Sequence, residues 1–380
     1  MKIIISPDSF KECLPAWKVA QALATGWRNV LPDSRLDCLP IADGGEGTLD
    51  TLIHATKGTF YDKTVTGPLG EPVNARFGIL GNRPTAVIEM AQASGLELIP
   101  ADQRNPLRAT SYGTGELILS ALDHHVDTII LCLGGSATND GGIGMMSALG
   151  ATFTDAQSKP VETCGLGLSA IHNIDLQHLD PRLKAVNMIA ACDVTNPLTG
   201  SHGATWVFGQ QKGASQEALA QLEQGMLNYA QCLHRCCGKE VDTVPGAGAA
   251  GGTGAALLAF LNAQLQPGIE IVLDAIQYTQ HLKYAALVIV GEGKLDNQSL
   301  NGKAPIGAAK AAHMMGVPVI AIAGYIDPQL DLSALRKCGI EACFSVVSGP
   351  CDLQTALREG EKNLIRLGEN LAGFFRAVLS

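Results

Sequence analysis

The sequence predicts an α/β protein: a doubly wound parallel sheet, with a large second α/β domain of mixed sheet inserted into it. Short apolar strands alternate with helical patterns at both ends of the 380-residue chain, and short strands separated by tight turns fill its middle. Glycine is abundant, at 43 residues, and aromatic residues make up only 5%, which is typical of a chain with many strand-to-helix turns. Hydrophobic residues make up 46% and charged residues 17%, which excludes disorder over most of the chain.

The first 60 residues predict a strand, a helix, a strand and a second helix, in that order. Residues 2–6 are an apolar run that predicts the first strand. Apolar residues recur at helical spacing from Trp17 to Trp27, and Pro15 suits the first turn of that helix. A second strand is expected over residues 36–41, and a glycine turn then opens a helix that ends near Ala55.

The C-terminal part repeats this alternation. A buried strand over residues 286–290 is followed by a long polar loop, which ends where Pro305 starts a helix. Two further strands and one long closing helix are expected over residues 317–323, 343–347 and 353–378. Because strands alternate with helices at both ends of the chain, we expect their strands to share one parallel sheet.

The middle of the chain differs in pattern. Residues 63–66, 72–80 and 86–90 alternate between apolar and polar, with turns between them, and predict an antiparallel or mixed sheet. Apolar strands are also expected over residues 128–133 and 186–191. We therefore expect a discontinuous flavodoxin-like domain and an inserted α/β domain, with the active site in the cleft between them. The first takes residues 1–65 plus 286–380, and the second takes residues 66–285.

Composition limits the partners. Lys and Arg number 27 and Asp and Glu number 36, a net charge of −9, so no basic face for nucleic acid is expected. No apolar run reaches the roughly 18 residues of a membrane helix, and the N-terminus lacks the apolar core of a signal peptide. The 11 cysteines are scattered, as reduced thiols would be. We expect a cytoplasmic protein, and a homodimer is compatible with the sequence.

Loops at the carboxyl ends of the predicted parallel strands are the expected ligand sites. These loops are residues 7–11, 43–48, 291–305 and 324–327, and three of the four combine acidic residues with glycine. Carboxylates can hold Mg²⁺ or act as a base, and lysines can neutralise phosphate oxygens. For Asp43, capping of the following helix is the alternative interpretation.

The inserted region has glycine loops of its own. Residues 134–144 follow a strand and open a helix, a pattern that predicts an anion site. A weak GxGxxG match begins at Gly246, but no clear strand precedes it, and close packing by small residues is the alternative. Ser111 starts another helix, where plain N-capping is equally consistent. Asp193 ends a predicted strand, as an acid, a base or an Asx-turn residue would.

Six motifs, taken together and in order, resemble the bacterial glycerate kinase family of the glycerate 2-kinase type. The resemblance runs from residue 1 to the C-terminal helix. One local departure is Glu12-Cys13, where the family pattern leads us to expect Gly-Ser. The motifs are MKIIISPDSFKECL, PIADGGEGT, GGSATNDGGIG, ACDVTNPL with GATWVFGQQKGA, PGAGAAGGTGAAL and VGEGKLDNQSLNGKAP.

The resemblance implies ATP-dependent phosphorylation of D-glycerate with Mg²⁺, and it favours 2-phosphoglycerate as the product. Glycerate 3-kinase activity, a NAD-dependent oxidoreductase and a non-catalytic ligand sensor are the alternatives. The reaction needs groups that position the substrates and neutralise charge. Candidates are Lys11, Asp193 and Asp296 for catalysis; Ser9, Ser111, Ser136 and Asn139 for the substrate; Gly134, Gly135, Gly251, Gly252, Lys294 and Lys303 for the nucleotide phosphates; and Asp43, Glu46 and Asp296 for the metal.

Overall fold

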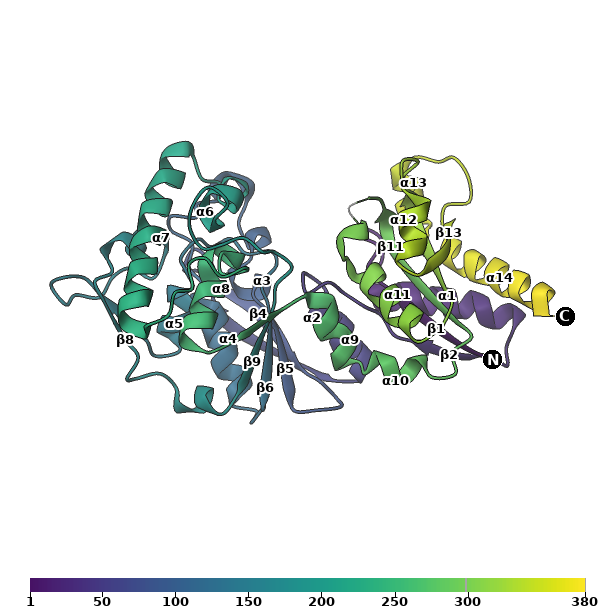
Figure 1. Cartoon of the computed structure of the whole chain (residues 1–380), viewed down its shortest axis with the longest axis horizontal. Helices are drawn as coiled ribbons and strands as arrows, with labels where there is room; N and C mark the ends of the chain where they lie inside the picture. Colours follow the sequence, from purple (N-terminus) through teal and green to yellow (C-terminus); the bar gives the residue numbers. More distant parts are fainter. Residues whose placement is uncertain (298, 380) are drawn as a thin grey trace. The chain divides into compact units, whose positions relative to one another are not determined.

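The computed structural model describes residues 1–297 and 299–379, which form two compact units (Figure 1). Both ends of the chain belong to the same unit, as the labels in Figure 1 show. Unit 1 consists of residues 1–43, 50–57 and 269 onward, and unit 2 consists of residues 44–49 and 58–268.

The boundaries of the units differ from the predicted domain boundaries at residues 66 and 285. Strand β3 (Thr59–Thr66) pairs with β4 (Pro72–Ile79) along its whole length, so it belongs to unit 2. At the other end, Ile269 packs against Gly307 of unit 1, and most of α9 (Gly268–Ala275) belongs to unit 1 as a result. Residues near the junctions belong to the unit against which they pack. Hydrophobic periodicity in the sequence does not identify that unit.

Unit 1 is built on five parallel strands in the order β2-β1-β11-β12-β13. This is the flavodoxin-like order, with unit 2 inserted between the second and third strands of the chain path. The predicted parallel sheet is confirmed. Its strands are β1 (Lys2–Pro7), β2 (Arg35–Cys38), β11 (Leu287–Leu295), β12 (Val319–Ile326) and β13 (Ile340–Ser345).

Both faces of this sheet are covered. Ile3 and Ile5 join a core cluster with α1 (Ala16–Val30) and α14 (Gly360–Leu379), whereas Ile4 on the opposite face is equally buried. Such double burial explains why the strands are continuously apolar. The other helices of this unit are α2 (Thr48–Thr56, mostly in unit 1), α10 (Tyr278–Leu282), α11 (Ala304–Met314), α12 (Leu332–Lys337) and α13 (Leu353–Arg358), with a 3-10 turn, η6 (Ser299–Asn301).

Helices α1 and α14 approach each other through two glycines, and Figure 1 shows them side by side. A Cβ atom on Gly26 would lie 1.8 Å from the carbonyl oxygen of Ile365. One on Gly368 would lie 2.5 Å from the carbonyl oxygen of Leu23. Only glycine allows backbones to pack this closely, so these positions join the two ends of the chain.

Three predicted elements end at other residues than expected. Strand β11 continues to Leu295, because residues 291–295 pair with the extended β12 instead of forming a loop. The second strand ends at Cys38, although the N–H of Leu39 still donates to the carbonyl of Ile5. The closing helix is interrupted at Glu359, so that α13 and α14 are separate helices.

Unit 2 contains a six-stranded mixed sheet in the order β10-β9-β6-β5-β4-β3. Strands β5, β6, β9 and β10 run parallel, and β3 and β4 are antiparallel additions at one edge. The predicted mixed sheet is confirmed. The strands not yet given are β5 (Thr85–Glu89), β6 (Thr128–Cys132), β9 (Asn187–Ala191) and β10 (Gln264–Gln266), with a separate pair, β7 (Thr152–Thr154) and β8 (Asn173–Asp175).

Helices of unit 2 bury one large apolar cluster against this sheet. Across residues 1–297 and 299–379, no helix has both the length and the apolarity that crossing a bilayer requires. The helices are α3 (Ala91–Ser94), α4 (Tyr112–Leu122), α5 (Ile143–Ala148), α6 (Ala204–Phe208), α7 (Gln216–Cys237) and α8 (Ala249–Phe260), with 3-10 turns η1 (Leu96–Leu98), η2 (Ala101–Gln103), η3 (Gly165–Ala170), η4 (Pro181–Lys184) and η5 (Gln210–Lys212).

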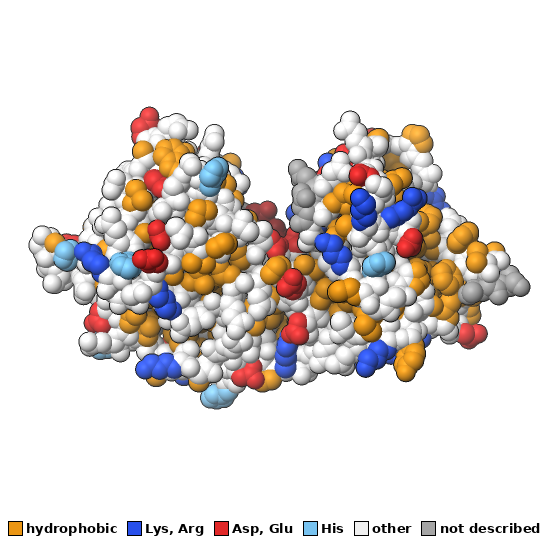
Figure 2. All heavy atoms as spheres, in the orientation of Figure 1, with side chains coloured by type: hydrophobic (Ala, Val, Ile, Leu, Met, Phe, Trp, Pro, Cys, Tyr) orange, Lys and Arg blue, Asp and Glu red, His pale blue; other side chains and the backbone are white. Residues whose placement is uncertain are grey.

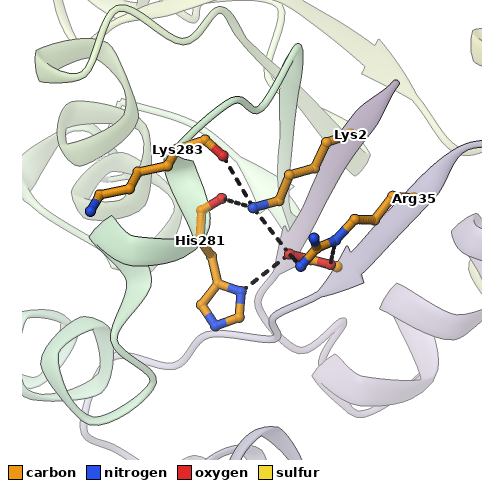
Figure 3. Close-up of polar contacts among 5 residues, drawn as sticks. Lys2, Arg35, His281 and Lys283 are labelled. Atoms are coloured by element: carbon orange, nitrogen blue, oxygen red, sulfur yellow. Dashed lines mark hydrogen bonds and ion pairs between the residues drawn. The ribbon is translucent and has the colours of Figure 1, made fainter.

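A charged cluster closes the amino end of the unit 1 sheet (Figure 3). Lys2, Arg35 and His281 converge on the carboxylate of Asp37, at 3.3, 3.1 and 3.2 Å. The Lys2 ammonium also donates to the carbonyl oxygens of His281 and Lys283. Asp37 is 13% exposed. Although burial raises its pKa, the hydrogen bonds from His281, Arg35 and Lys2 bring the pKa below its usual value.

We expect Asp37→Asn to lower the free energy of unfolding by about 1–3 kcal/mol at neutral pH, as for other hydrogen bonds to charged groups. A carboxylate with a lowered folded-state pKa stabilises above its unfolded pKa, and this stabilisation is lost as pH falls through the folded pKa. The difference between the variant and the wild type should therefore shrink below about pH 4. Urea unfolding across pH measures this.

The matched control is Asp62→Asn, which removes the exposed partner of Arg76. We expect this change to stay within about 0.5 kcal/mol, because exposed ion pairs contribute little. If both variants lowered the free energy of unfolding equally, Asp37 would contribute no more than an exposed ion-pair partner.

Candidate active site

A cavity of about 820 Å³ opens in unit 1 at the carboxyl ends of its strands. The parallel pairing of β1 with β11 sets Pro7 opposite Gly291, and the N–H of Asp8 donates to the Gly291 carbonyl oxygen at 2.8 Å. The loops after successive strands therefore converge, as predicted. The charged and hydroxyl lining residues include Asp8, Ser9, Lys11, Asp43, Glu292, Lys294 and Lys303, and the apolar ones include Phe10, Val346, Val347, Leu353 and Leu357.

Asp8 is a half-buried carboxylate of this cavity. The pKa of Asp8 is raised to about 7, by burial and by the charges of Asp43 and Glu292, against the opposing effects of the Ser9 N–H and Lys11. The Ser9 N–H donates to Asp8 Oδ1 at 2.6 Å. The two neighbouring carboxylates therefore disfavour the ionisation of Asp8.

Glu292 lies on the extended part of β11. Burial raises the pKa of Glu292, while the Ser299 hydroxyl and Lys303 oppose that rise. Its Oε2 lies 3.7 Å from Lys303 Nζ, and its Oε1 is buried without a hydrogen-bond partner in the structure. An orphaned carboxylate oxygen of this kind is suited to a ligand cation.

Asp296 is placed differently from the other predicted acids. Its carboxylate pairs with Lys294 at 3.0 Å and accepts from the N–H of Ser299, at the start of a 3-10 turn. It is absent from the residues that line the described cavity. These contacts describe a pair that orients Lys294, and they leave the proposed catalytic and metal roles of Asp296 as predictions.

The backbone conformation at Glu12 accounts for the glycine that the family pattern has at this position. It adopts a φ of 61°, in the left-handed region that favours glycine, which is the residue that the resemblance leads us to expect there. The neighbouring Cys13 lines the cavity. The backbone therefore keeps a glycine-type turn beside Lys11 even with a glutamate in that position.

The first glycine loop of unit 2 already holds an anion of its own. Asp140 is fully buried and accepts hydrogen bonds from the N–H groups of Ser111, Gly142 and Gly144 and from the Ser111 hydroxyl. Burial raises the pKa of Asp140, and these donors oppose the rise. The backbone donors that predicted an external anion at residues 141–144 therefore bind Asp140.

The Ser111 hydroxyl belongs to the same hydrogen-bond network around Asp140. Its hydroxyl donates to Asp140 at 2.7 Å and accepts from the N–H of Met145 at 2.9 Å. Because the side chain is fully buried and both of its hydrogen-bonding functions are used, Ser111 serves the packing of α4 against α5. Its predicted contact with substrate has no support in this geometry.

A second buried charge lies close by. Lys212 is 3% exposed, and its ammonium donates to the Ser136 hydroxyl at 2.9 Å and to the Thr138 carbonyl at 2.7 Å. Burial lowers the pKa of Lys212 to about 8, with the Asp140 charge opposing. The Asn139 amide donates to Thr205 Oγ1 at 3.1 Å, while its Oδ1 is buried without a partner in the structure.

Glycines of the two unit 2 loops differ in accessibility. Gly134 and Gly135 are exposed, and a Cβ on Gly134 would lie 3.0 Å from the Cα of Gly45. Gly251 and Gly252 are buried, and a Cβ on Gly251 would lie 2.0 Å from the Thr138 carbonyl oxygen. The second loop therefore has a packing role, which was the alternative weighed for it from the sequence.

The remaining predicted residues also belong to unit 2. Glu46 lies in the segment of residues 44–49, and Asp193 is an exposed residue whose Oδ1 accepts from the Gly268 N–H at 2.9 Å. Ser9, Lys11, Asp43, Lys294 and Lys303, which the sequence places on strand-end loops, all line the unit 1 cavity, and their roles stay predictions. The sequence analysis did not single out Asp8, Glu292 or Lys212, although each lies inside a quoted motif.

Comparisons with known proteins agree along the whole chain. The model of the glycerate kinase family matches residues 3–376. Glycerate 2-kinase from Escherichia coli K12 is 50% identical over 98% of this chain and 97% of its own length. Glycerate kinase from Bacillus subtilis 168 is 48% identical over 98% of this chain and 97% of its own.

A solved structure agrees as well. A crystal structure from Salmonella typhimurium LT2, which carries the provisional name glycerate kinase 2, matches with a TM-score of 0.92 and 48% identity. That match covers 100% of this chain and 99% of the other. Because the family model, the relatives and the solved structure each match essentially its full length, the chain belongs to the glycerate kinase family.

Proposed function

We propose that the chain transfers the γ-phosphoryl group of ATP to the 2-hydroxyl of D-glycerate and forms 2-phosphoglycerate. Membership in a kinase family implies ATP as the co-substrate. The 2-position follows the relative named glycerate 2-kinase. The observation that carries the proposal is the unit 1 cavity, where three lysines and four carboxylates meet an apolar end.

The nucleotide occupies this cavity in our proposal. A volume of about 820 Å³ lies within the usual range of small-molecule sites, about 300–1,000 Å³. The apolar residues Val346, Val347 and Leu357 suit the base, and Lys11, Lys294 and Lys303 neutralise the phosphates. Phosphoryl transfer needs such positioning and charge neutralisation more than covalent chemistry.

The carboxylates of the cavity fit a magnesium ion. Among the residues that the structure describes, no cluster of three or more His, Cys, Asp or Glu is arranged as a complete metal site. Mg²⁺ commonly uses only one or two carboxylates together with substrate phosphates, so a complete protein cage is not needed. The orphaned Glu292 oxygen and the mutually repelling Asp8 and Asp43 favour a cation there. Bound Mg²⁺ would screen phosphate charge.

Other assignments stay predictions. The base is predicted to be Asp193 or Asp296, the contacts of Ser9 and Asn139 with substrate are untested, and Glu46 remains a candidate metal ligand. An active site in a cleft between the two domains, a cytoplasmic location and a homodimer likewise stay predictions. The oxidoreductase alternative loses its basis, because a Cβ on Gly248 of the GxGxxG pattern would lie 2.2 Å from the Pro197 carbonyl oxygen, which indicates a packing role.

We expect Lys11→Ala to lower kcat by at least about 100-fold, because removal of one electrostatic stabiliser of a transition state typically has this effect. Lys18→Ala is the control, since Lys18 is exposed on α1 and lies over the Trp17 ring. A coupled assay of ADP release measures both. Near-normal turnover by a folded Lys11→Ala protein would show that this lysine has no role in transfer.

We expect ATP to slow the alkylation of Cys351, because this exposed cysteine lines the proposed nucleotide cavity. Cys236 is also exposed and belongs to unit 2, so its alkylation should continue at the same rate. Mass spectrometry of the labelled peptides, with and without ATP, reports nucleotide location independently of turnover. Protection of Cys236 instead of Cys351 would move the nucleotide out of unit 1.

We expect the product to be consumed directly by enolase, which acts on 2-phosphoglycerate. The 3-phosphate would require a mutase before enolase can act. Adding enolase with and without mutase to the completed reaction therefore assigns the phosphorylated hydroxyl. Absorbance that rises only when mutase is present would establish glycerate 3-kinase activity.

A further inference from the structure

Lys212 differs from every other basic side chain that the structure describes. It is the single buried Lys or Arg among residues 1–297 and 299–379. The other described Lys and Arg residues are half-buried or exposed. Lys310 of α11 and Arg336 and Lys337 of α12, for example, are exposed. Figure 2 shows Lys and Arg side chains on the surface of this part of unit 1. Burying an ammonium is costly unless it is paired or hydrogen-bonded, so the position of Lys212 requires an explanation.

We propose that Lys212 and Ser136 form the subsite that binds the carboxylate of the substrate. The inference rests on the proposed function and specifies which part of unit 2 receives D-glycerate. Ser136 is the direct donor to the carboxylate, and Lys212 is the buried charge behind it. Neither the family match nor the names of the relatives assigns these roles.

The hydrogen bonds of Lys212 leave one donor unused. An ammonium has three N–H donors, and two of them go to Ser136 Oγ and to the Thr138 carbonyl. No carboxylate of the described residues lies within ion-pair distance of its Nζ. The charge of Asp140 acts on Lys212 only at longer range, since its two oxygens are held by Ser111, Gly142 and Gly144.

Ser136 is oriented by this contact. Because its oxygen accepts from Lys212, its own proton is directed elsewhere and can be donated to a ligand. The side chain is 8% exposed, and the preceding Gly134 and Gly135 are exposed, so the loop is reachable from solvent. An anion at this loop meets a hydroxyl donor with a buried positive charge behind it.

The amount of charge favours a carboxylate over a nucleotide. The unit 1 cavity offers Lys11, Lys294 and Lys303, which matches the several charges of a triphosphate. The unit 2 loop offers Lys212 alone, which matches the single charge of a glycerate carboxylate. Each substrate is thereby matched to the unit whose basic side chains correspond in number to its own charge.

Kinetics of four proteins test the subsite: the wild type, Lys212→Met, Ser136→Ala and the control Lys239→Met. Lys239 is a matched lysine, since its ammonium also donates to one carbonyl (Leu258) and one side-chain oxygen (Asn262) of unit 2. We expect Lys212→Met to raise the KM for D-glycerate about 10- to 100-fold, the usual effect of losing a hydrogen-bonded charge. The KM for ATP and all constants of Lys239→Met should stay at the wild-type values.

The uncharged amide of D-glyceric acid separates recognition of the carboxylate from a general loss of activity. Wild type and Lys212→Met should use this amide with similar kcat/KM, because neither gains from the missing charge. A structural role of Lys212 would instead reduce the use of acid and amide equally, and that result would overturn the proposal. So would an unchanged KM for glycerate in Lys212→Met.

Ser136→Ala decides the question if Lys212→Met fails to fold, because it keeps the buried lysine. We expect it to raise the KM for glycerate without changing the KM for ATP, and an unchanged glycerate KM would contradict the subsite. Calorimetric measurement of D-glycerate binding without ATP distinguishes failure of the proposed function from failure of the subsite. A wild type that binds glycerate without phosphorylating it contradicts the proposed function, and the subsite is still supported if Lys212→Met loses that binding.

Discussion

The pairing of β1 with β11 is the constraint on which the unit 1 site depends. These strands are separated by most of the chain, yet their register from Ile3 opposite Leu287 to Pro7 opposite Gly291 is continuous. A shift by one residue would turn the buried side chains to the opposite face of the sheet. It would also separate Asp8 from Glu292, because both acids directly follow this paired segment. Sheet register and site geometry are therefore one property of the molecule.

The buried carboxylates of the two units differ in how completely their oxygens are hydrogen-bonded. Unit 2 surrounds Asp140 with donors from its own backbone and from Ser111, so this carboxylate needs nothing from outside. Unit 1 leaves Asp8 and Glu292 close to each other, with raised pKa values and one orphaned oxygen. A saturated network stabilises a fold, whereas an unsaturated one disfavours the empty state and favours a ligand that supplies the missing charge.

Much of the fold could be predicted from sequence, because parallel strands buried on both faces are continuously apolar and glycines mark the turns that follow them. Lys11 and Asp43 were predictable as cavity residues from the same rule about strand ends. The extension of β11 could not be predicted, because Glu292 and Lys294 resemble loop residues unless β12 is known to extend beside them. Lys212 could not be singled out from sequence. Its distinguishing feature is burial, and burial depends on packing between segments distant in sequence.

The insertion of unit 2 between β2 and β11 also has a consequence for synthesis of the protein. At roughly 5–20 residues per second, translation takes about 10 to 45 seconds to pass from residue 44 to residue 268. During this interval the nascent chain displays Ile3, Ile4 and Ile5 without the strand that will flank them on one side. Such an open apolar edge is a template for wrong pairing. Newly made chains therefore depend on unit 2 completing its own fold promptly, or on chaperones that shield the waiting strand.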